Sequence, residues 1–494
     1  MKQKPVAQWP RHPTIYEINT WVWLHELSEQ ARCPITLFNV PKKQWDAIAE
    51  YGFDAVWLMG VWERSPAGIA ISMRNDGLMA EFHRLLPDFR PEDNVGSAYC
   101  IRDYRVDLRL GGPEGLAEAR KQLAARGMRL ILDFVPNHVA PDHRWATDHP
   151  DYFIQGSSDD LSNHPNGFIR VGEHVLACGR DPYFPAWSDV LQVHAFNDDL
   201  RKAAIETVLS IAGQCDGMRC DMAMLLLNHV FDQTWGVRAG TMPQTEYWRD
   251  LIGVVKLQFP DVLFIAEAYW DLEWELQQQG FDFCYDKRLY DRLEHGSGED
   301  IRLHLCADHA YQEKLIRFIE NHDEPRAAAT FSASKARAAA VTVSTLQGAA
   351  LFHDGQFEGR RTKLPVFLRR RSQEPIDVGL QEFYKALLRI LQHDDFQRGQ
   401  WQLCDRTGWP DNQSYLNLVA WSLVHERSRH LMVVNLSDIS SQGRIRLPSS
   451  ALRGGQWRMT DELSGIVYER DGAAIRQDGL YVDLNPWHFH ILRF

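Results

Sequence analysis

The sequence lacks most features of a metal-rich, membrane-bound or nucleic-acid-binding protein. Its eight cysteines are scattered over 494 residues without a Cys-x-x-Cys pair, which argues against a zinc site built from cysteines. No apolar run approaches the roughly 20 residues of a membrane span. The net charge of −12 argues against a nucleic-acid partner. Residues 1–10 lack the apolar core of a signal peptide, so we expect a cytoplasmic protein with buried, free thiols.

The chain is rich in apolar and aromatic residues instead. Its hydrophobic content of 45% is enough for a large core, and its length predicts two or three domains. It contains 17 Trp, 15 Tyr and 23 Phe. Most of these rings are expected in the core, but sugar-binding sites also stack aromatic faces on sugar rings. The composition therefore gives weak support for a sugar ligand.

Short apolar runs alternate with helical segments over the first 350 residues or so. Alternating strands and helices predict a parallel sheet, and eight such units favour a closed (β/α)8 barrel, or TIM barrel, over an open sheet. Helices are predicted at residues 44–51, 114–126, 198–214 and 245–259. The predicted strands are residues 14–19, 55–59, 129–134, 217–221, 262–266, 281–285, 314–319 and 349–353.

Two regions break this alternation and define the predicted domains. After the third strand the helical period disappears, and residues 139–196 are too long for an ordinary connecting loop, so we predict an inserted domain there. From residue 399 to 494, short β-favouring runs separated by turn residues predict an all-β sandwich domain. Residues 1–138 and 197–398 then form the catalytic barrel.

Polar residues stand where several predicted strands end, at Asp133, Asp221, Glu267 and His322-Asp323. Barrel enzymes place their chemistry at the C-terminal ends of the strands. A single acid in such a place is more often a turn residue, but four strands ending this way make that explanation poor. Arg219 lies two residues before Asp221, on the same face of a strand, where it favours an ionised carboxylate. An ordinary ion pair would look the same, but an oriented carboxylate is also what a nucleophile requires.

Five motifs resemble the α-amylase family of glycoside hydrolases, in the family's order and on the expected strands. They cover most of the chain, and the β-rich C-terminal region fits the same family. Each motif is weak alone, and the five together are specific. They are Asp133-Phe-Val-Pro-Asn-His138, Gly217-x-Arg219-x-Asp221, Phe264-Ile-Ala-Glu267, Phe318-Ile-Glu-Asn-His322-Asp323 and Tyr99-x-x-x-Asp103-Tyr104.

The resemblance implies a retaining hydrolase for α-glucosidic bonds in oligosaccharides or small α-glucosides. Asp221 would be the nucleophile that forms a covalent β-glycosyl intermediate, and Glu267 the general acid and base. Apolar surroundings after its strand would favour the protonated form of Glu267. Asp323 would hold sugar hydroxyls and favour the distorted transition state. The implied substrate-binding residues are Tyr99, which stacks on the sugar, Asp133, His138, Arg219, which orients Asp221, and His322.

The sequence departs from the family at positions that bear on substrate and metal. Met224 and Leu225 replace a Lys-His pair that contacts sugars in many starch-degrading members, which puts action on long polymers in doubt. Asn137 matches a calcium ligand of some members, but no further ligands are evident. We therefore predict no cofactor and no metal among the site residues, with calcium left open, and the oligomeric state is not predicted.

Three alternatives remain. A transglycosylase or phosphorylase of the same family, acting on sucrose-like, trehalose-like or malto-oligosaccharide substrates, would use the same catalytic residues. A metal-dependent hydrolase barrel usually has His-x-His on its first strand, which residues 14–19 lack. A non-catalytic relative would lose a carboxylate, and none is missing. The arginines that could bind phosphate, although such charges are more often solvated, are Arg74, Arg360, Arg361 and Arg369–Arg371.

Overall fold

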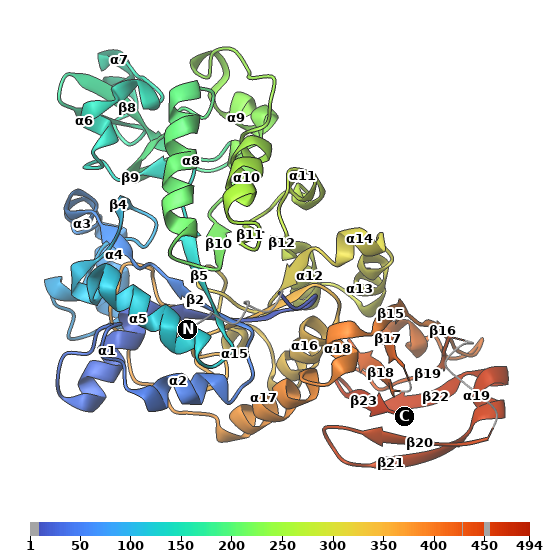
Figure 1. Ribbon diagram of the computed structural model, residues 1–494. Coiled ribbons are helices and arrows are strands. Elements are labelled where there is room, and N and C mark those ends of the chain that lie inside the picture. Colours follow the sequence, from blue (N-terminus) through green and yellow to red (C-terminus); the bar gives the residue numbers. More distant parts are fainter. Residues whose placement is uncertain (1–8, 427, 449–454) are drawn as a thin grey trace.

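The computed structural model describes residues 9–426, 428–448 and 455–494, and its centre is a closed parallel barrel (Figure 1). The eight strands follow one another around the barrel in the order β1-β14-β13-β12-β11-β10-β5-β2. Each strand lies within one of the ranges predicted from the sequence, so the barrel prediction is confirmed. Their bounds are β1 Thr14–Asn19, β2 Ala55–Met59, β5 Arg129–Phe134, β10 Gly217–Cys220, β11 Leu263–Ala266, β12 Phe283–Tyr285, β13 Leu315–Arg317 and β14 Ala349–His353.

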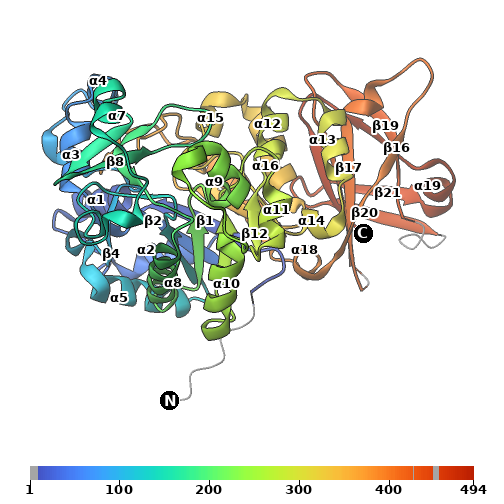
Figure 2. The same cartoon turned by 90° about the horizontal axis from the view of Figure 1, so that it is seen from above.

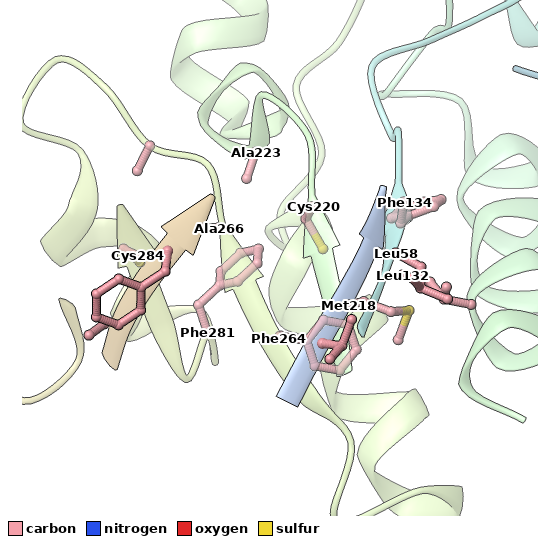
Figure 3. Packing of buried hydrophobic residues seen from close by; sticks show 14 of the residues in the cluster. Leu58, Leu132, Phe134, Met218, Cys220, Ala223, Phe264, Ala266, Phe281 and Cys284 are labelled. Atoms are coloured by element: carbon pink, nitrogen blue, oxygen red, sulfur yellow. The ribbon is translucent and has the colours of Figure 1, made fainter. Parts of the chain in front are cut away.

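Alternation along each strand sorts the side chains into two layers. Leu132, Met218 and Phe264 pack in the outer layer against the surrounding helices (Figure 3). Ile131 and Ile265, one position away, pack with the residues inside the barrel. Because both faces are buried, the strands read as continuous apolar runs. The outer helices include α2 Lys42–Ala49, α5 Gly112–Ala124, α8 Asp198–Ala212, α10 Tyr247–Gln258, α12 Lys287–His295, α16 Ala333–Thr345 and α17 Val378–Leu391.

The segment between β5 and α8 folds over the barrel rim as a small antiparallel sheet (Figure 1). Its strand order is β6-β9-β8-β7, with β6 His138–Val139, β7 Phe168–Val171, β8 His174–Gly179 and β9 Trp187–Gln192. The pairing of His138 with Gln192 brings the end of the insertion back beside its start. The sequence indicated an insertion here but did not indicate its sheet.

The C-terminal region consists of two antiparallel sheets beside the barrel, on a different side from the insertion (Figures 1 and 2). The predicted all-β region is confirmed, although the sequence did not indicate the helix α19 Gly472–Asp478. The larger sheet runs β15 Gln400–Leu403, β17 Leu418–His425, β18 Ser428–Asn435, β23 Phe489–Arg493, β20 Gln456–Asp461 and β21 Val467–Asp471; the smaller runs β16 Asp405–Thr407, β19 Ser441–Arg446 and β22 Leu480–Leu484.

Two expectations about the whole chain can be compared with the structure. All eight cysteines are free, but Cys33 and Cys306 are exposed, so the expectation that every thiol is buried is wrong. Cys306 is the C-cap residue of the helix α13 Gly298–Leu305. Within the described ranges, no helix has the length and apolarity needed to cross a membrane.

Candidate active site

Two neighbouring strands carry acids at equivalent positions. Asp221 follows β10 and Glu267 follows β11, and the last residues of these strands, Cys220 and Ala266, are register partners. The ladder continues past the strand ends, because the Asp221 amide donates to the Phe134 carbonyl at 2.8 Å and the Glu267 amide to the Cys220 carbonyl at 3.0 Å. Both carboxyl groups are therefore held at the same height at the barrel mouth.

A cavity of about 350 Å³ opens at this mouth. It is lined by five residues expected from the sequence, Asp221, Glu267, Asp323, Tyr99 and His138. Its volume lies near the lower end of the range for small-molecule sites. The other lining residues are Ser97, Trp187, Asp189, Val190, Met222, Tyr269 and Phe367.

Arg219 lies beneath the cavity and is fully buried. Its guanidinium donates to Asp221 at 2.5 Å and lies 2.8 Å from Glu267, without the alignment of a hydrogen bond to the latter. The rings of Trp57, Tyr99 and Tyr285 surround the cation at 5.2–5.7 Å. One fixed cation thus serves both strand-end carboxyl groups.

The electrostatics of Asp221 differ from the expectation. Burial raises the pKa of Asp221 to about 8, and the charge of Glu267 adds to this effect against the opposing influence of Arg219. The sequence suggested that the adjacent arginine would keep this acid ionised. The arginine does not keep the pKa of Asp221 low, because its guanidinium also faces Glu267 and the desolvation of Asp221 has the larger effect.

Glu267 is held by three polar groups rather than the apolar surroundings expected from the sequence. Besides Arg219, the backbone amide of Met222 donates to its Oε2 at 2.6 Å and the Tyr269 hydroxyl donates to its Oε1 at 2.8 Å. Met222 has a φ of 44°, in the left-handed region that non-glycine residues rarely adopt. This conformation accompanies the amide contact with Glu267, an example of backbone strain located at a functional site.

His322 joins Asp323 to a buried acid that the sequence did not single out. Its Nδ1 lies 2.5 Å from Glu17 on β1, and its Nε2 lies 2.8 Å from Asp323 and 2.7 Å from the Tyr99 hydroxyl. Burial lowers the pKa of His322, but Asp323 and Glu17 outweigh it and raise that pKa to about 10. For Asp323 the balance runs the other way. Burial raises its pKa, but the neighbouring His322 cation outweighs burial, so the pKa of Asp323 is lowered overall. Asp323 therefore lines the cavity as a carboxylate, and the His322 cation lies behind it without lining the cavity itself.

His138 is also buried but has no such partner. Burial lowers its pKa to about 4, so the ring is neutral near pH 7. It packs against Trp187 of the insertion, with ring centres 5.2 Å apart. His138 thus lines the cavity as a neutral hydrogen-bonding group, whereas His322 is a cation behind the cavity wall.

Asp133 lies inside the barrel and does not line the cavity. Its side chain is fully buried and accepts hydrogen bonds from Trp57 Nε1 at 3.1 Å and from the Gly60 amide at 2.9 Å. Burial raises its pKa to about 6. These contacts place Asp133 to hold β2 beside β5, and the substrate binding expected of it from the sequence stays a prediction.

Other differences concern residues that no motif marks. Trp187 and Asp189 reach the cavity from β9, and Phe367 reaches it from the long segment after β14. They lie in regions without a period or a motif, so only the fold reveals them. Met224 and Leu225, by contrast, are buried in the core and cannot contact a sugar.

The residues around Asn137 do not fit a calcium ion. The Asn137 side chain is buried and exchanges hydrogen bonds with the Gln192 amide, accepting at 2.9 Å and donating at 3.2 Å. Gln192 Nε2 also donates to the Asn137 carbonyl at 3.0 Å. Calcium requires six to eight oxygen ligands, usually including carboxylates, whereas this donor set is a closed pair of amides.

These features define an enzyme with a parallel (β/α)8 barrel and a carboxyl-lined pocket at the C-terminal ends of its strands. The chain belongs to the α-amylase family, because the model of the α-amylase catalytic domain matches residues 42–421. The α-amylase MalA of Haloarcula japonica is 24% identical over 362 residues, which is 72% of this chain and 45% of that protein. An α-1,4-glucan:maltose-1-phosphate maltosyltransferase of Cereibacter sphaeroides is 25% identical over 189 residues, 36% of this chain and 23% of the other. The chain thus spans less than half the length of these curated relatives.

Solved structures share the fold over nearly the whole chain. The maltogenic α-amylase AmyB of Thermotoga neapolitana superimposes with a TM-score of 0.68 at 18% identity, covering 98% of this chain and 99% of the other. An α-amylase of Lactobacillus plantarum gives a TM-score of 0.67 at 19% identity with the same coverage. At this identity the likeness concerns the fold alone.

Proposed function

We propose that the chain cleaves α-glucosidic bonds in oligosaccharides or small α-glucosides with retention of configuration. The observation that supports this best is that Asp221 and Glu267 face one cavity from adjacent strands. Neighbouring strands lie about 4.8 Å apart, close to the roughly 5–5.5 Å between the carboxyl groups of a retaining glycosidase. An inverting enzyme needs a wider gap for a water molecule.

In the proposed reaction, an Asp221 oxygen attacks the anomeric carbon while Glu267 gives its proton to the departing glycosidic oxygen. A β-glycosyl ester of Asp221 forms as the glycosidic bond breaks. Glu267, now a carboxylate, then takes a proton from water, whose oxygen attacks the anomeric carbon and releases Asp221. The reaction requires an ionised Asp221 carboxylate and a proton on Glu267 when the sugar binds.

The remaining residues are assigned by their place in the cavity. Asp323, paired with the His322 cation, would accept hydrogen bonds from sugar hydroxyls, and Tyr99 would stack against the ring. His138 would bond a hydroxyl as a neutral ring. Arg219 would hold Asp221 in place from below, since it is fully buried.

The charge of the cavity lining favours water or a sugar over phosphate as the acceptor of the glycosyl group. Among the described residues that line it, none is arginine or lysine. The arginines considered for phosphate are largely engaged elsewhere: Arg370 pairs with Asp93 at 2.7 Å, and Arg371 pairs with Glu26 at 2.8 Å. The buried positions of Met224 and Leu225 agree with a short substrate.

Substitution of the proposed nucleophile tests this assignment. We expect Asp221→Asn to lower kcat by at least about 1,000-fold, as for removal of an essential covalent nucleophile. Glu267→Gln should be slow as well, but azide should restore its turnover on substrates with a good leaving group, because azide needs no general base. Azide should not produce the same product with Asp221→Asn. Unaltered turnover by Asp221→Asn would exclude Asp221 as the nucleophile.

The products identify the reaction. Sucrose, maltose, maltotriose, trehalose, glucosylglycerol and soluble starch should be compared with and without phosphate, and the anomer first released followed by NMR. We expect the α-anomer of the released sugar and no sugar phosphate. Release of the β-anomer would contradict retention, and phosphate-dependent cleavage would identify a phosphorylase.

A further inference from the structure

A second cluster of ionisable side chains lies between the barrel and the β-domain. His393 immediately precedes the short helix α18 Asp394–Arg398, His430 lies on β18, and Glu462 follows β20. One nitrogen from each histidine and one oxygen from Glu462 lie within 4.8 Å of one another. His393 Nε2 is 3.4 Å and His430 Nε2 is 3.9 Å from Glu462 Oε2. None of the three lines the catalytic cavity.

His430 has a buried nitrogen without a hydrogen-bond partner. The residue is fully buried, and its Nε2 makes no hydrogen bond. Its Nδ1 lies 2.7 Å from Asp395 Oδ2, so the Nδ1 proton is bonded to that carboxylate and the free electron pair is on Nε2. That electron pair points into the cluster, where a buried polar atom without a partner is costly.

The buried His430 and the partly buried Glu462 are each oriented by a further side chain, as metal ligands are. Asp395 accepts from His430, the carboxylate–histidine arrangement that fixes the ring of a metal-binding histidine. Arg493 Nε lies 2.9 Å from Glu462 Oε1, which leaves Oε2 directed at the two imidazoles. The Glu462 amide donates to the Ile491 carbonyl at 2.9 Å, which fixes this residue to β23.

The ligand types and spacings select a class of ion. Two imidazoles and a carboxylate suit zinc and neighbouring transition metals, whereas calcium and magnesium take oxygen ligands. Ligand bonds of 2.0–2.2 Å at tetrahedral angles place ligand atoms roughly 3.4 Å apart. The His393–Glu462 distance already has this value, and the His393 side chain is 34% exposed and can move toward His430.

We propose that His393, His430 and Glu462 bind one zinc-type divalent ion that fastens the β-domain to the end of the barrel. The ion would join three separate segments: the turn after α17, β18 and the end of β20. The position of the half-exposed His393 leaves a fourth coordination site accessible to water. The ion is structural in this proposal and takes no part in the reaction at Asp221.

Zinc binding to the chelator-treated, full-length protein tests the proposal. Isothermal titration with ZnCl2 should show one site per chain, and Zn²⁺ should raise the Tm, because an ion that binds only the folded state stabilises it. His393→Gln and Glu462→Gln should each weaken binding by more than about 100-fold, and Asp395→Asn by about 10- to 100-fold, as for an outer partner. Bound Co²⁺ should give the visible absorption of a tetrahedral site.

His425→Gln is the matched control, because His425 lies 4.0 Å from Asp395 but is outside the trio. It should bind Zn²⁺ as the wild type does. Near-UV circular dichroism of metal-free His393→Gln checks that this variant is folded. Absence of stoichiometric binding to the wild type, or equal affinity in wild type, His393→Gln and Glu462→Gln, would overturn the proposal and leave the cluster a polar domain contact.

Discussion

Two buried histidines, His138 in the cavity wall and His322 behind it, show how partners decide the charge of a residue. His138 faces Trp187 and Asn137, and burial lowers its pKa to about 4. His322 is equally buried, but the carboxylates of Asp323 and Glu17 raise its pKa to about 10 against the effect of burial. The same side chain therefore supplies a neutral group in the cavity wall at His138 and a cation behind Asp323 at His322.

Glu17→Gln should weaken the His322 cation and destabilise the protein. Breaking a buried ion pair costs about 3–5 kcal/mol, because one charge is left without its partner. The folded pKa of His322, about 10, lies above its unfolded value of 6.5. Its stabilising contribution is thus complete below pH 6.5 and is lost as the pH rises toward 10. Denaturant unfolding of both proteins at pH 6, 8 and 10 measures the difference.

The stability difference between wild type and Glu17→Gln should shrink as the pH rises. A difference that stays constant from pH 6 to 10 would mean that His322 is neutral in the folded protein. Asp54→Asn serves as a comparison, because Asp54 accepts hydrogen bonds from Thr14 at the other end of β1 rather than from a histidine. Its destabilisation should not follow the titration of His322.

Residue types in motifs could be predicted, but their environments could not. The positions of Asp221, Glu267 and Asp323 follow from strand ends and spacing, because the alternation of a strand fixes which side chains share a face. The pKa of Asp221 and the contacts of Glu267 depend on burial and on the Met222 amide, which only the folded chain brings there. The role of Glu17 could not be predicted either, because it depends on the contact with His322, which is distant in sequence.

At the scale of elements, β6 and β9 hold the insertion over the active site through backbone pairing and one pair of side-chain amides. Gln192, at the end of β9, bonds both the side chain and the backbone of Asn137, next to β6. This pairing fixes the segment that carries His138 on one side and Trp187 on the other. The sequence indicated the insertion by its missing period, but a sheet of short, irregular strands has no period long enough to recognise.

Gln192→Ala should destabilise the insertion without creating a need for calcium. The change removes the Gln192 donor from the buried Asn137 Oδ1 and the Gln192 acceptor from its Nδ2, at a cost of about 1–3 kcal/mol for each group left unsatisfied. Addition of CaCl2 to chelator-treated wild type should change neither kcat nor Tm, because the amide pair does not provide a calcium site. Thermal unfolding and initial rates measure both effects. A clear rise in Tm with Ca²⁺ that is lost in Gln192→Ala would contradict this reasoning.

At the scale of the whole molecule, the central strand β17 of the larger C-terminal sheet is buried on both faces. Along β17, Leu418 and Ala420 pack against the smaller sheet, whereas Val419 and Trp421 join the core shared with the barrel helices. Trp421 is fully buried, and its indole donates to the Thr345 carbonyl of α16 at 3.1 Å. This explains why β17 reads as a continuous apolar run rather than an alternating one.

Because barrel and β-domain share this core, they should unfold together. Trp421→Ala should lower the free energy of unfolding by about 3–5 kcal/mol, the usual result of removing a buried tryptophan. The whole chain should still unfold in a single calorimetric transition, at a lower temperature. Trp409→Ala is the control, because Trp409 is only half buried and packs on Tyr481 within the β-domain; its cost should be clearly smaller. If Trp421→Ala instead splits the transition, with the β-domain melting first and the barrel unchanged, the two parts are independent, and the shared core does not couple them.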